Sequence, residues 1–235
     1  DHRDLHLSLR RQRQMCIRDR FLTGCDDNTA WQLPWFLHNF RANCKGELYL
    51  ADFGLTHKEV YDEFDGIVKV KEGDGWFKKP SAILKASRIY GITKVCWLDT
   101  DCEVKQSIDD IFDLSVPQQL GMVEDRPWTK RRGKWGKWYN SGVVLVEGFP
   151  TILGEWAREC IVNPVQGDQE VLHEMTSDPL RKLKYINPLP HKYNTLRIDY
   201  MDGIADKNPR VVHHTGLKGK NKIQIDIAMG LEKEI

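Results

Sequence analysis

The fold is decided by the stretch Lys94-Val95-Cys96-Trp97-Leu98-Asp99-Thr100-Asp101-Cys102-Glu103-Val104, in which an apolar run ends in two acids separated by one residue. The run predicts a buried strand whose carboxyl end carries Asp99 and Asp101. Side chains at positions i and i+2 of an extended segment point the same way, with Cα atoms about 6.6 Å apart. One hard divalent cation, Mn²⁺ or Mg²⁺, can therefore take oxygens from both acids and keep positions open for phosphate oxygens.

An isolated Asp-x-Asp is common, and its simplest interpretation is two solvated acids that open a loop. Here the two acids follow the apolar run 95–98 directly. This position favours the metal-site interpretation, because ligands of open α/β sheets gather beyond the carboxyl ends of the strands.

The composition is that of an ordinary globular protein with a sizeable core, since 40% of the 235 residues are hydrophobic and 29% are charged. The net charge of +1 gives no general argument for a nucleic-acid or membrane partner. Six scattered cysteines without a Cys-x-x-Cys pair favour reduced thiols, so we expect a cytoplasmic location. No apolar stretch approaches the roughly 18 residues of a membrane span, and no signal peptide is recognisable.

The first twenty residues differ from the rest and hold six arginines. They suit a basic arm for an anionic partner, but the string Gln14 to Arg20 also resembles translated read-through of a sequencing adaptor. We expect residues 1–20 to be an irregular extension, and if they are adaptor read-through they do not belong to the natural protein. We place a single domain at 21–235.

From Phe21 onward, strand and helix patterns alternate. The first half predicts strands at 21–25, 47–52, 67–70 and 94–98, with helices at 30–40, from 56, and at 79–90. The second half is less regular, with strands expected at 120–123, 139–146, 183–186 and 210–213 and helices at 107–114, 151–160 and 168–175. Such alternation predicts an α/β domain whose mostly parallel sheet is covered by helices on both faces.

Three later stretches place polar groups where strands or helices end. Tyr139-Asn140-Ser141-Gly142 precedes a buried strand, and a simple turn is the alternative interpretation. Gly167-Asp168-Gln169 opens a helix, where Asp168 as an N-cap is the alternative. The stretch 211–220 offers a strand-end imidazole at His213, then glycines whose backbone can approach phosphate and lysines that neutralise it.

Taken in order, five segments resemble the GT-A glycosyltransferases of the glycogenin and galactosyltransferase type, glycosyltransferase family 8. These are Leu22-Thr23, 97–101, 139–143, Asp168-Gln169 and 212–218. The resemblance covers nearly all of residues 21–220 and implies a single Rossmann-like GT-A domain. It implies an enzyme that moves a sugar from a nucleotide-sugar, usually a UDP-sugar, to a hydroxyl acceptor with retention of anomeric configuration.

The same resemblance implies roles for individual residues. Asp99, Asp101 and His213 would hold Mn²⁺ (or Mg²⁺), and Asp168 and Gln169 would lie at the reacting face. Whether either attacks covalently or only stabilises an oxocarbenium-like state stays open. The implied donor-binding residues are Thr23, Gly24, Asp99, Thr100, Asp101, Asp125, Asn140, Ser141, Gly216 and Lys218. The sequence departs from the family at Leu217-Lys218-Gly219-Lys220, where Lys-Pro-Trp is usual, so either lysine can meet the diphosphate.

The stretch 126–138 carries six basic residues, three tryptophans and no acid. Tryptophan faces stack on sugars and on bases, while the cations suit phosphate or a phosphorylated glycan. Because the stretch precedes the Asn140 segment, we expect Trp128 and Trp135 to contact the acceptor, which is a glycan, a protein or another hydroxyl compound. A solvated loop with Trp138 packed is the alternative.

Two other functions compete with glycosyl transfer. A sugar nucleotidyltransferase should carry a Gly-rich loop with Arg or Lys directly after the first strand, where this chain has Gly24-Cys25-Asp26-Asp27. A non-enzymatic nucleic-acid-binding module would use residues 126–138, yet it leaves Asp99, Asp101 and His213 without a purpose.

Overall fold

The computed structural model describes residues 18–89, 91–132 and 136–230. Its strands are β1 (Arg18–Cys25), β2 (Leu48–Asp52), β3 (Gly66–Lys69), β4 (Ile92–Leu98), β5 (Cys102–Val104), β6 (Leu120–Glu124), β7 (Tyr139–Glu147), β8 (Ile186–Pro188), β9 (Thr195–Leu196) and β10 (Val211–His213). Its α-helices are α2 (Leu33–Asn43), α3 (Lys79–Ser87), α4 (Arg126–Arg132), α5 (Thr151–Val162), α6 (Asp168–Met175), α7 (Pro179–Tyr185), α8 (Arg197–Met201) and α9 (Gly216–Ala228). Short 3₁₀ turns are η1 (Ala30–Gln32), η2 (Glu59–Glu63), η3 (Gly75–Lys78), η4 (Asp109–Leu114) and η6 (His191–Tyr193).

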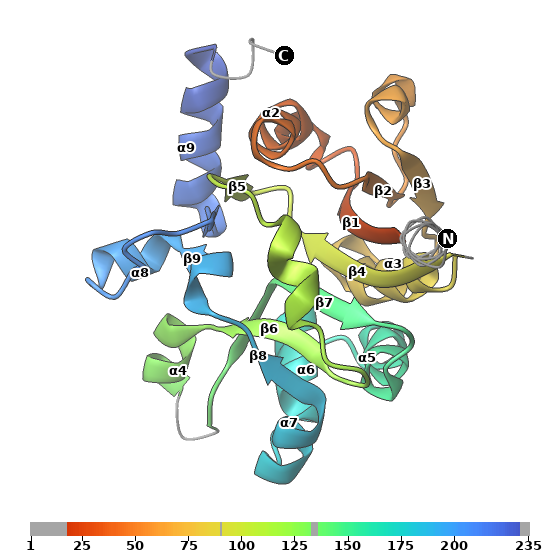
Figure 1. The fold of residues 1–235 in the computed structure, drawn as a ribbon, viewed down its shortest axis with the longest axis vertical. Coiled ribbons are helices and arrows are strands. Elements are labelled where there is room, and N and C mark those ends of the chain that lie inside the picture. The colour runs from red at the N-terminus through yellow and green to blue at the C-terminus, as the bar shows by residue number, and fades with distance from the viewer. Residues whose placement is uncertain (1–17, 90, 133–135, 231–235) are drawn as a thin grey trace, which may run out of the picture.

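Seven strands form the central sheet in the spatial order β3-β2-β1-β4-β7-β6-β8. Strands β3, β2, β1 and β4 pair in parallel, as do β6 and β8, whereas β7 runs antiparallel to both of its neighbours. The predicted α/β class with a mostly parallel mixed sheet is therefore confirmed (Figure 1).

Both faces of this sheet are buried, as consecutive residues of β1 show. Phe21 packs in one core with α2, while Leu22 packs in the other core with α3, α5 and α6, and neither side chain is exposed. Successive strand side chains point to opposite faces, so two adjacent apolar residues require helices on both sides. Figure 1 shows α2 on one side of β1 and β4 and α3 on the other.

The reversed direction of β7 decides where the polar groups meet. Leu98, the last residue of β4, pairs with Val143, and the Asp99 amide donates to the Gly142 carbonyl oxygen over 2.8 Å. The amino end of β7 therefore lies at the carboxyl end of β4. Asn140 and Ser141, which belong to the first residues of β7, come to the same sheet edge as Asp99.

A second sheet has three strands in the order β5-β10-β9, and it positions His213, the third of the predicted metal-binding residues. Strand β10 pairs antiparallel with β5, and this register sets His213 opposite Cys102. Because Cys102 follows Asp101 directly, the pairing brings the imidazole to the acidic pair from more than 100 residues away in the chain.

Several sequence-based predictions differ from the structure. Residues 18–20 are not irregular, because β1 begins at Arg18 and the nearly buried Arg20 forms an ion pair of 2.7 Å with Glu47. The rest of the predicted extension, 1–17, lies outside the described residues. The helices expected from 56 and at 107–114 are the 3₁₀ turns η2 and η4.

The strand predicted at 183–186 is wrong, because helix α7 occupies most of that range and the short β8 begins only at Ile186. The start signals of α7 are ordinary ones. Asp178 caps it by accepting a hydrogen bond from the Arg181 amide over 2.8 Å, and Pro179 follows in the first turn. Among the described residues, no helix combines the length and the apolar character that crossing a membrane requires.

Candidate active site

A cavity of about 710 Å³ opens at the carboxyl edge of β1 and β4, beside the amino end of β7. It gathers sequence-predicted residues from distant parts of the chain. Those that line it are Gly24, Asp99, Thr100, Asp101, Trp128, Asn140, Ser141, Asp168, Gln169, His213 and Gly216.

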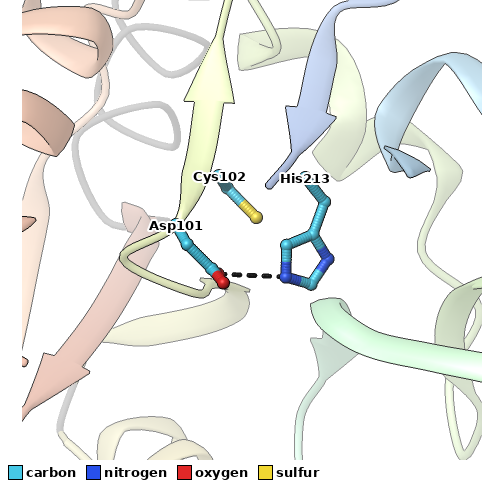
Figure 2. Close-up of side chains that lie close together, drawn as sticks. All are labelled: Asp101, Cys102 and His213. Carbon is cyan, nitrogen blue, oxygen red and sulfur yellow. Dashed lines mark ion pairs between the residues drawn. The ribbon is translucent and has the colours of Figure 1, made fainter. Parts of the chain in front are cut away.

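Two acids and an imidazole converge on one side of this cavity. The His213 Nε2 lies 3.0 Å from Asp101 Oδ1 and 3.8 Å from Asp99 Oδ2. Figure 2 shows Asp101 and His213 reaching toward each other from the β4–β5 turn and from β10, with Cys102 beside them. Ligand atoms of Asp101, Cys102 and His213 lie within 4.8 Å of one another, so these residues can hold a metal ion.

Cys102 is the weakest of these potential ligands. Burial raises the pKa of its thiol well above the ordinary value, and the nearby Asp101 carboxylate adds to this. The Sγ atom lies 3.7 Å from the Gly142 carbonyl oxygen, to which a thiol can donate. A protonated thiol is a poor ligand, so the carboxylates and the imidazole are the donors that the site offers a hard cation.

The orientation of His213 is fixed from behind by Asn140. The Asn140 Oδ1 lies 3.1 Å from His213 Nδ1 and also accepts hydrogen bonds from the Gly142 amide and Asn194 Nδ2, both over 2.9 Å. A backbone amide can only donate, so this amide oxygen is an acceptor and Nδ1 must carry the proton. The neutral ring then presents the lone pair of Nε2 to the acids, as a metal-binding histidine does.

The protonation states of this pair are coupled. Burial alone would lower the pKa of His213, but the Asp101 carboxylate raises it above the ordinary 6.5. Burial alone would raise the pKa of Asp101, but His213 lowers it. Without a cation the imidazole is drawn toward its charged form, and a metal must displace that proton.

Lys79, which the sequence analysis missed, joins the acids of the cavity. Its nitrogen lies 3.0 Å from Asp99 Oδ1 and 3.2 Å from Asp168 Oδ2, and it donates to the Ser141 carbonyl oxygen over 3.1 Å. The residue is only 4% exposed. Burial alone would lower the pKa of Lys79, but Asp168 and Asp99 hold it above its ordinary value. Lys79 therefore remains charged and sets the positions of both carboxylates.

Asp168 begins α6 and does not act as its N-cap, which is Gly167. Its backbone oxygen accepts a hydrogen bond from Trp156 Nε1 over 2.8 Å, and its carboxylate faces Lys79. Burial raises the pKa of Asp168, whereas Lys79 opposes this rise. The alternative interpretation of Asp168 as a simple cap is therefore wrong.

Asp125 lies behind the cavity wall, where it connects the wall's residues instead of lining the cavity. Its Oδ2 accepts hydrogen bonds from Asn140 Nδ2 and Gln169 Nε2, both over 3.2 Å, and its Oδ1 accepts one from the Trp128 amide over 2.9 Å. Only 2% of the residue is exposed. Asp125 therefore positions Gln169 and the start of α4.

Two other predicted residues also fall outside the cavity. Thr23 is fully buried within β1, while its neighbour Gly24 lines the cavity. Lys218 is exposed and points elsewhere, whereas Lys220 lines the cavity, because residues four apart share a helix face and residues two apart do not. Trp135 lies outside the described residues.

Beyond Lys79, the sequence analysis missed other residues of the cavity wall. Asp26 and Asn28, interpreted there only as a turn, line the cavity at the end of β1. Their strand-end position, equivalent to that of Asp99, is a signal that could have identified them. Trp76, which is 60% exposed, also lines the cavity, as does Phe53, which stacks on Trp97 with ring centroids 6.1 Å apart.

Comparison with known proteins gives the fold. No protein-family model matches the chain, and no curated protein matches its sequence. Solved structures do match, among them galactosyltransferase LgtC in complex with donor and acceptor sugar analogues, at 16% identity and a TM-score of 0.59, over 84% of this chain and 87% of that one. The apo form of the glycosyltransferase GlyE from Streptococcus pneumoniae TIGR4 matches at 16% identity and a TM-score of 0.58, over 91% and 64% of the two chains.

Mouse xyloside xylosyltransferase 1 in its apo form also matches, at 13% identity and a TM-score of 0.52, over 83% of this chain and 97% of that one. At these identities the likeness concerns the fold. The chain has the GT-A fold of these glycosyltransferases, and the fold that the sequence resemblance implied is confirmed.

Gly142 provides a test of the packing that sets His213. A Cβ atom added at this position would lie 2.1 Å from His213 Cε1, so Gly142→Ala must displace the ring or the strand. We expect a loss of about 1–3 kcal/mol in the free energy of unfolding, measured by urea denaturation. The matched control is Gly154→Ala in α5, where nothing lies within 4 Å of the added atom. The control should be neutral or stabilising by up to about 1 kcal/mol, and equal losses would contradict this account.

Proposed function

We propose that this protein is a metal-dependent glycosyltransferase that moves a sugar from a UDP-sugar to a hydroxyl acceptor with retention of anomeric configuration. The observation that carries the proposal is the meeting of Asp99, Asp101 and His213 with Asp168 in one cavity of a GT-A fold. The LgtC structure that matches this chain holds donor and acceptor sugar analogues, which supports a sugar-transfer reaction here.

The cation would be held by Asp99 Oδ2, Asp101 Oδ1 and His213 Nε2. These two carboxylate oxygens and one neutral imidazole nitrogen are donors that Mn²⁺ accepts. Asp99 Oδ1 is the more committed oxygen, because Trp97 Nε1 donates to it over 2.6 Å and the Lys79 nitrogen lies 3.0 Å from it. Lys79 also donates to Oδ2 over 3.2 Å, so the cation would share that oxygen with Lys79. Mn²⁺ or Mg²⁺ bound there would neutralise charge on the departing diphosphate.

The chain's own groups for the diphosphate lie at the start of α9. Gly216 and Lys220 line the cavity, and the first turn of this 13-residue helix carries no acid. A helix amino end presents free amides and a partial positive charge, which favour phosphate oxygens. We therefore assign the phosphate-neutralising role to Lys220 in place of Lys218.

The reacting face would be formed by Asp168 and Gln169. Lys79 fixes the Asp168 carboxylate, and Asp125 and Asn140 fix the Gln169 amide, so both groups are oriented before substrate arrives. Preorganised groups of this kind stabilise an oxocarbenium-like transition state. One of the matching LgtC structures is a variant in which an active-site glutamine is substituted, which supports a role for Gln169 at the reacting face. The departing phosphate can take the proton of the acceptor hydroxyl, so no separate strong base is needed.

The nucleoside end of the cavity would be formed by Gly24, Asp26 and Phe53, which all line it. The Asp26 carboxylate already accepts hydrogen bonds from the Thr29 amide and hydroxyl, over 3.1 and 2.9 Å. A carboxylate has further lone pairs, so it can accept from the N–H of a uracil ring. The buried Thr23 supports the strand beneath this end.

The donor assignment predicts a thermal shift. UDP with Mn²⁺ at 100 times the dissociation constant should add about 2.7 kcal/mol of stability. For a chain of this size that raises Tm by roughly 5–10 °C. UDP without metal should give a much smaller shift in the same fluorimetric assay. ADP and GDP serve as base controls, and equal shifts from all three nucleotides would disprove the uracil pocket.

The metal assignment predicts different effects for the two adjacent histidines. Asp101→Asn and His213→Ala should each abolish the Mn²⁺-dependent part of the UDP shift. His214→Ala should keep that part while lowering Tm, because His214 Nε2 lies 2.9 Å from Glu103 and its ring packs edge-on against Trp35. If His214→Ala lost the metal dependence and His213→Ala kept it, His214 would be the metal ligand and the assignment of His213 would be wrong by one residue.

The proton on His213 predicts how metal affinity depends on pH. Since Asp101 raises the pKa of His213 above 6.5, their ion pair stabilises the metal-free fold below pH 6.5, and this stabilisation disappears as pH rises through the folded pKa. A cation needs the neutral ring, so Mn²⁺ affinity should rise over that same interval. Titration of the free protein with Mn²⁺ alone at pH 6 and pH 8, followed by the electron paramagnetic resonance of unbound Mn²⁺, measures this. Equal affinities would count against His213 as a ligand.

A further inference from the structure

The last turn of α4 presents three consecutive cations, Lys130, Arg131 and Arg132, which we name the basic rim. Lys130 and Arg131 are exposed, and Arg132 is partly buried. Glycosyl transfer from a nucleotide-sugar, as proposed above, gives these residues no task, because they lie beyond the groups assigned to the donor. They come from the basic, tryptophan-rich stretch that the sequence analysis singled out.

The basic rim adjoins the cavity through Trp128. This side chain lines the cavity, and the Arg132 guanidinium lies over its ring at 4.1 Å from the centroid. The Trp128 amide donates to Asp125, which also holds Gln169. Two hydrogen bonds through Asp125 therefore join Trp128 to the reacting face, and Trp138 stacks against Trp128 at 5.9 Å. A sugar that packs against the cavity-lining part of Trp128 would lie between the rim and the reacting face.

The charges of the basic rim are not compensated within the part of the chain that the structure describes. None of the three residues forms an ion pair there, whereas nearby Lys137 pairs with Glu124 over 2.9 Å. The excess positive charge is also felt inside the protein. Burial, followed by the charges of Lys182 and Arg132, lowers the pKa of His173 to about 4. Uncompensated cations beside a substrate cavity favour a ligand of opposite charge.

We propose that the acceptor is an anionic saccharide, whose sugar ring packs against the cavity-lining part of Trp128 and whose phosphate or carboxylate group is bound by Arg131, three positions further along the same helix face, with Lys130 adding its charge from the adjacent face. The proposal rests on the transfer reaction proposed above and specifies its acceptor. The planar guanidinium fork matches both anions, and lysine adds a point charge. Arg132 is already held against the Trp128 ring, which leaves the Arg131 guanidinium free to bind the anion and Lys130 free to add its charge.

The size and the setting of the basic rim favour a small anion over a polyanion. Three cations occupy a single turn, and the cavity beside them is lined by Asp99, Asp101 and Asp168. An extended nucleic-acid strand would need cations along its length beyond this single turn, and the cavity beside the rim would already hold the anionic donor. A saccharide with one charged group can leave that group at the rim and insert only its neutral hydroxyl.

The test compares matched acceptors in two charge variants. Initial rates with a UDP-sugar donor are measured for methyl galactoside and methyl glucoside, their 6-phosphates and the corresponding uronic acids. The test variant is K130Q/R131Q, which leaves the Arg132–Trp128 contact in place. The control is K45Q/R88Q, which removes the same charge from two exposed residues after α2 and α3, at the opposite edge of the sheet.

The wild type should use at least one anionic acceptor with a kcat/KM at least ten times that for its neutral parent. K130Q/R131Q should abolish this preference through a higher KM, while K45Q/R88Q retains it. Donor hydrolysis, the UDP and Mn²⁺ thermal shift and the rate with neutral acceptors should be unchanged in both variants. The KM for the anionic acceptor should rise with salt in the wild type. The phosphate and uronate arms identify which anion is recognised.

Equal use of neutral and anionic acceptors would overturn the proposal, as would an equal rise of KM in both variants. Loss of binding to vesicles of phosphatidylglycerol and phosphatidylcholine, or to an oligonucleotide, in K130Q/R131Q without a change in KM would assign the rim to a membrane or a nucleic acid instead. Donor hydrolysis and the UDP shift need no acceptor, so their absence in the wild type would refute the transferase itself, and the acceptor proposal with it.

Discussion

The buried ammonium group of Lys79 is the interaction on which the rest of the site depends. Three carboxylates, those of Asp99, Asp101 and Asp168, face one cavity, and such crowding is unfavourable without nearby positive charge. Lys79 contacts the first and the third, while His213 contacts the second and lies 3.8 Å from the first. Burying the Lys79 ammonium group without these acids would also be unfavourable, so the opposite charges offset one another's desolvation penalties. The arrangement retains one acid in excess over the two cations, which suits a site that receives a divalent ion.

Much of the fold could be predicted from the sequence, because it follows from short-range pattern. The apolar run before Asp99 and the alternation of strands and helices fix the class, and both are seen in the structure. The direction of β7 could not be predicted, since it depends on pairing between Leu98 and Val143, 45 positions apart. The prediction failed at α7 for another reason. Its cap at Asp178 and Pro179 was visible in the sequence but was outweighed by the short apolar pattern near Ile186.

The candidate site divides in the same way. Strand-end acids and the Asn140 segment were found because their position in the chain signals their position in space. Lys79 was not found, because nothing local distinguishes it from Lys78, whose nitrogen donates to the Phe53 carbonyl oxygen over 2.6 Å. The choice between Lys218 and Lys220 required the knowledge that α9 is already helical at Gly216. Helical spacing, unlike that of a loop, turns one lysine into the cavity and the other away.

Asn140 explains why the cation site, the reacting face and the acceptor side are expected to act together. Its Oδ1 lies 3.1 Å from His213 Nδ1, and its Nδ2 donates to Gln169 Oε1 and to Asp125 Oδ2. Asp125 in turn holds the Trp128 amide. Every polar atom of the Asn140 side chain is therefore committed, and it cannot rotate for one partner without losing another. Because these partners come from β10, α6, α4 and the residue that joins β6 to α4, the short segment at the start of β7 fixes the relative positions of elements that the chain otherwise keeps far apart.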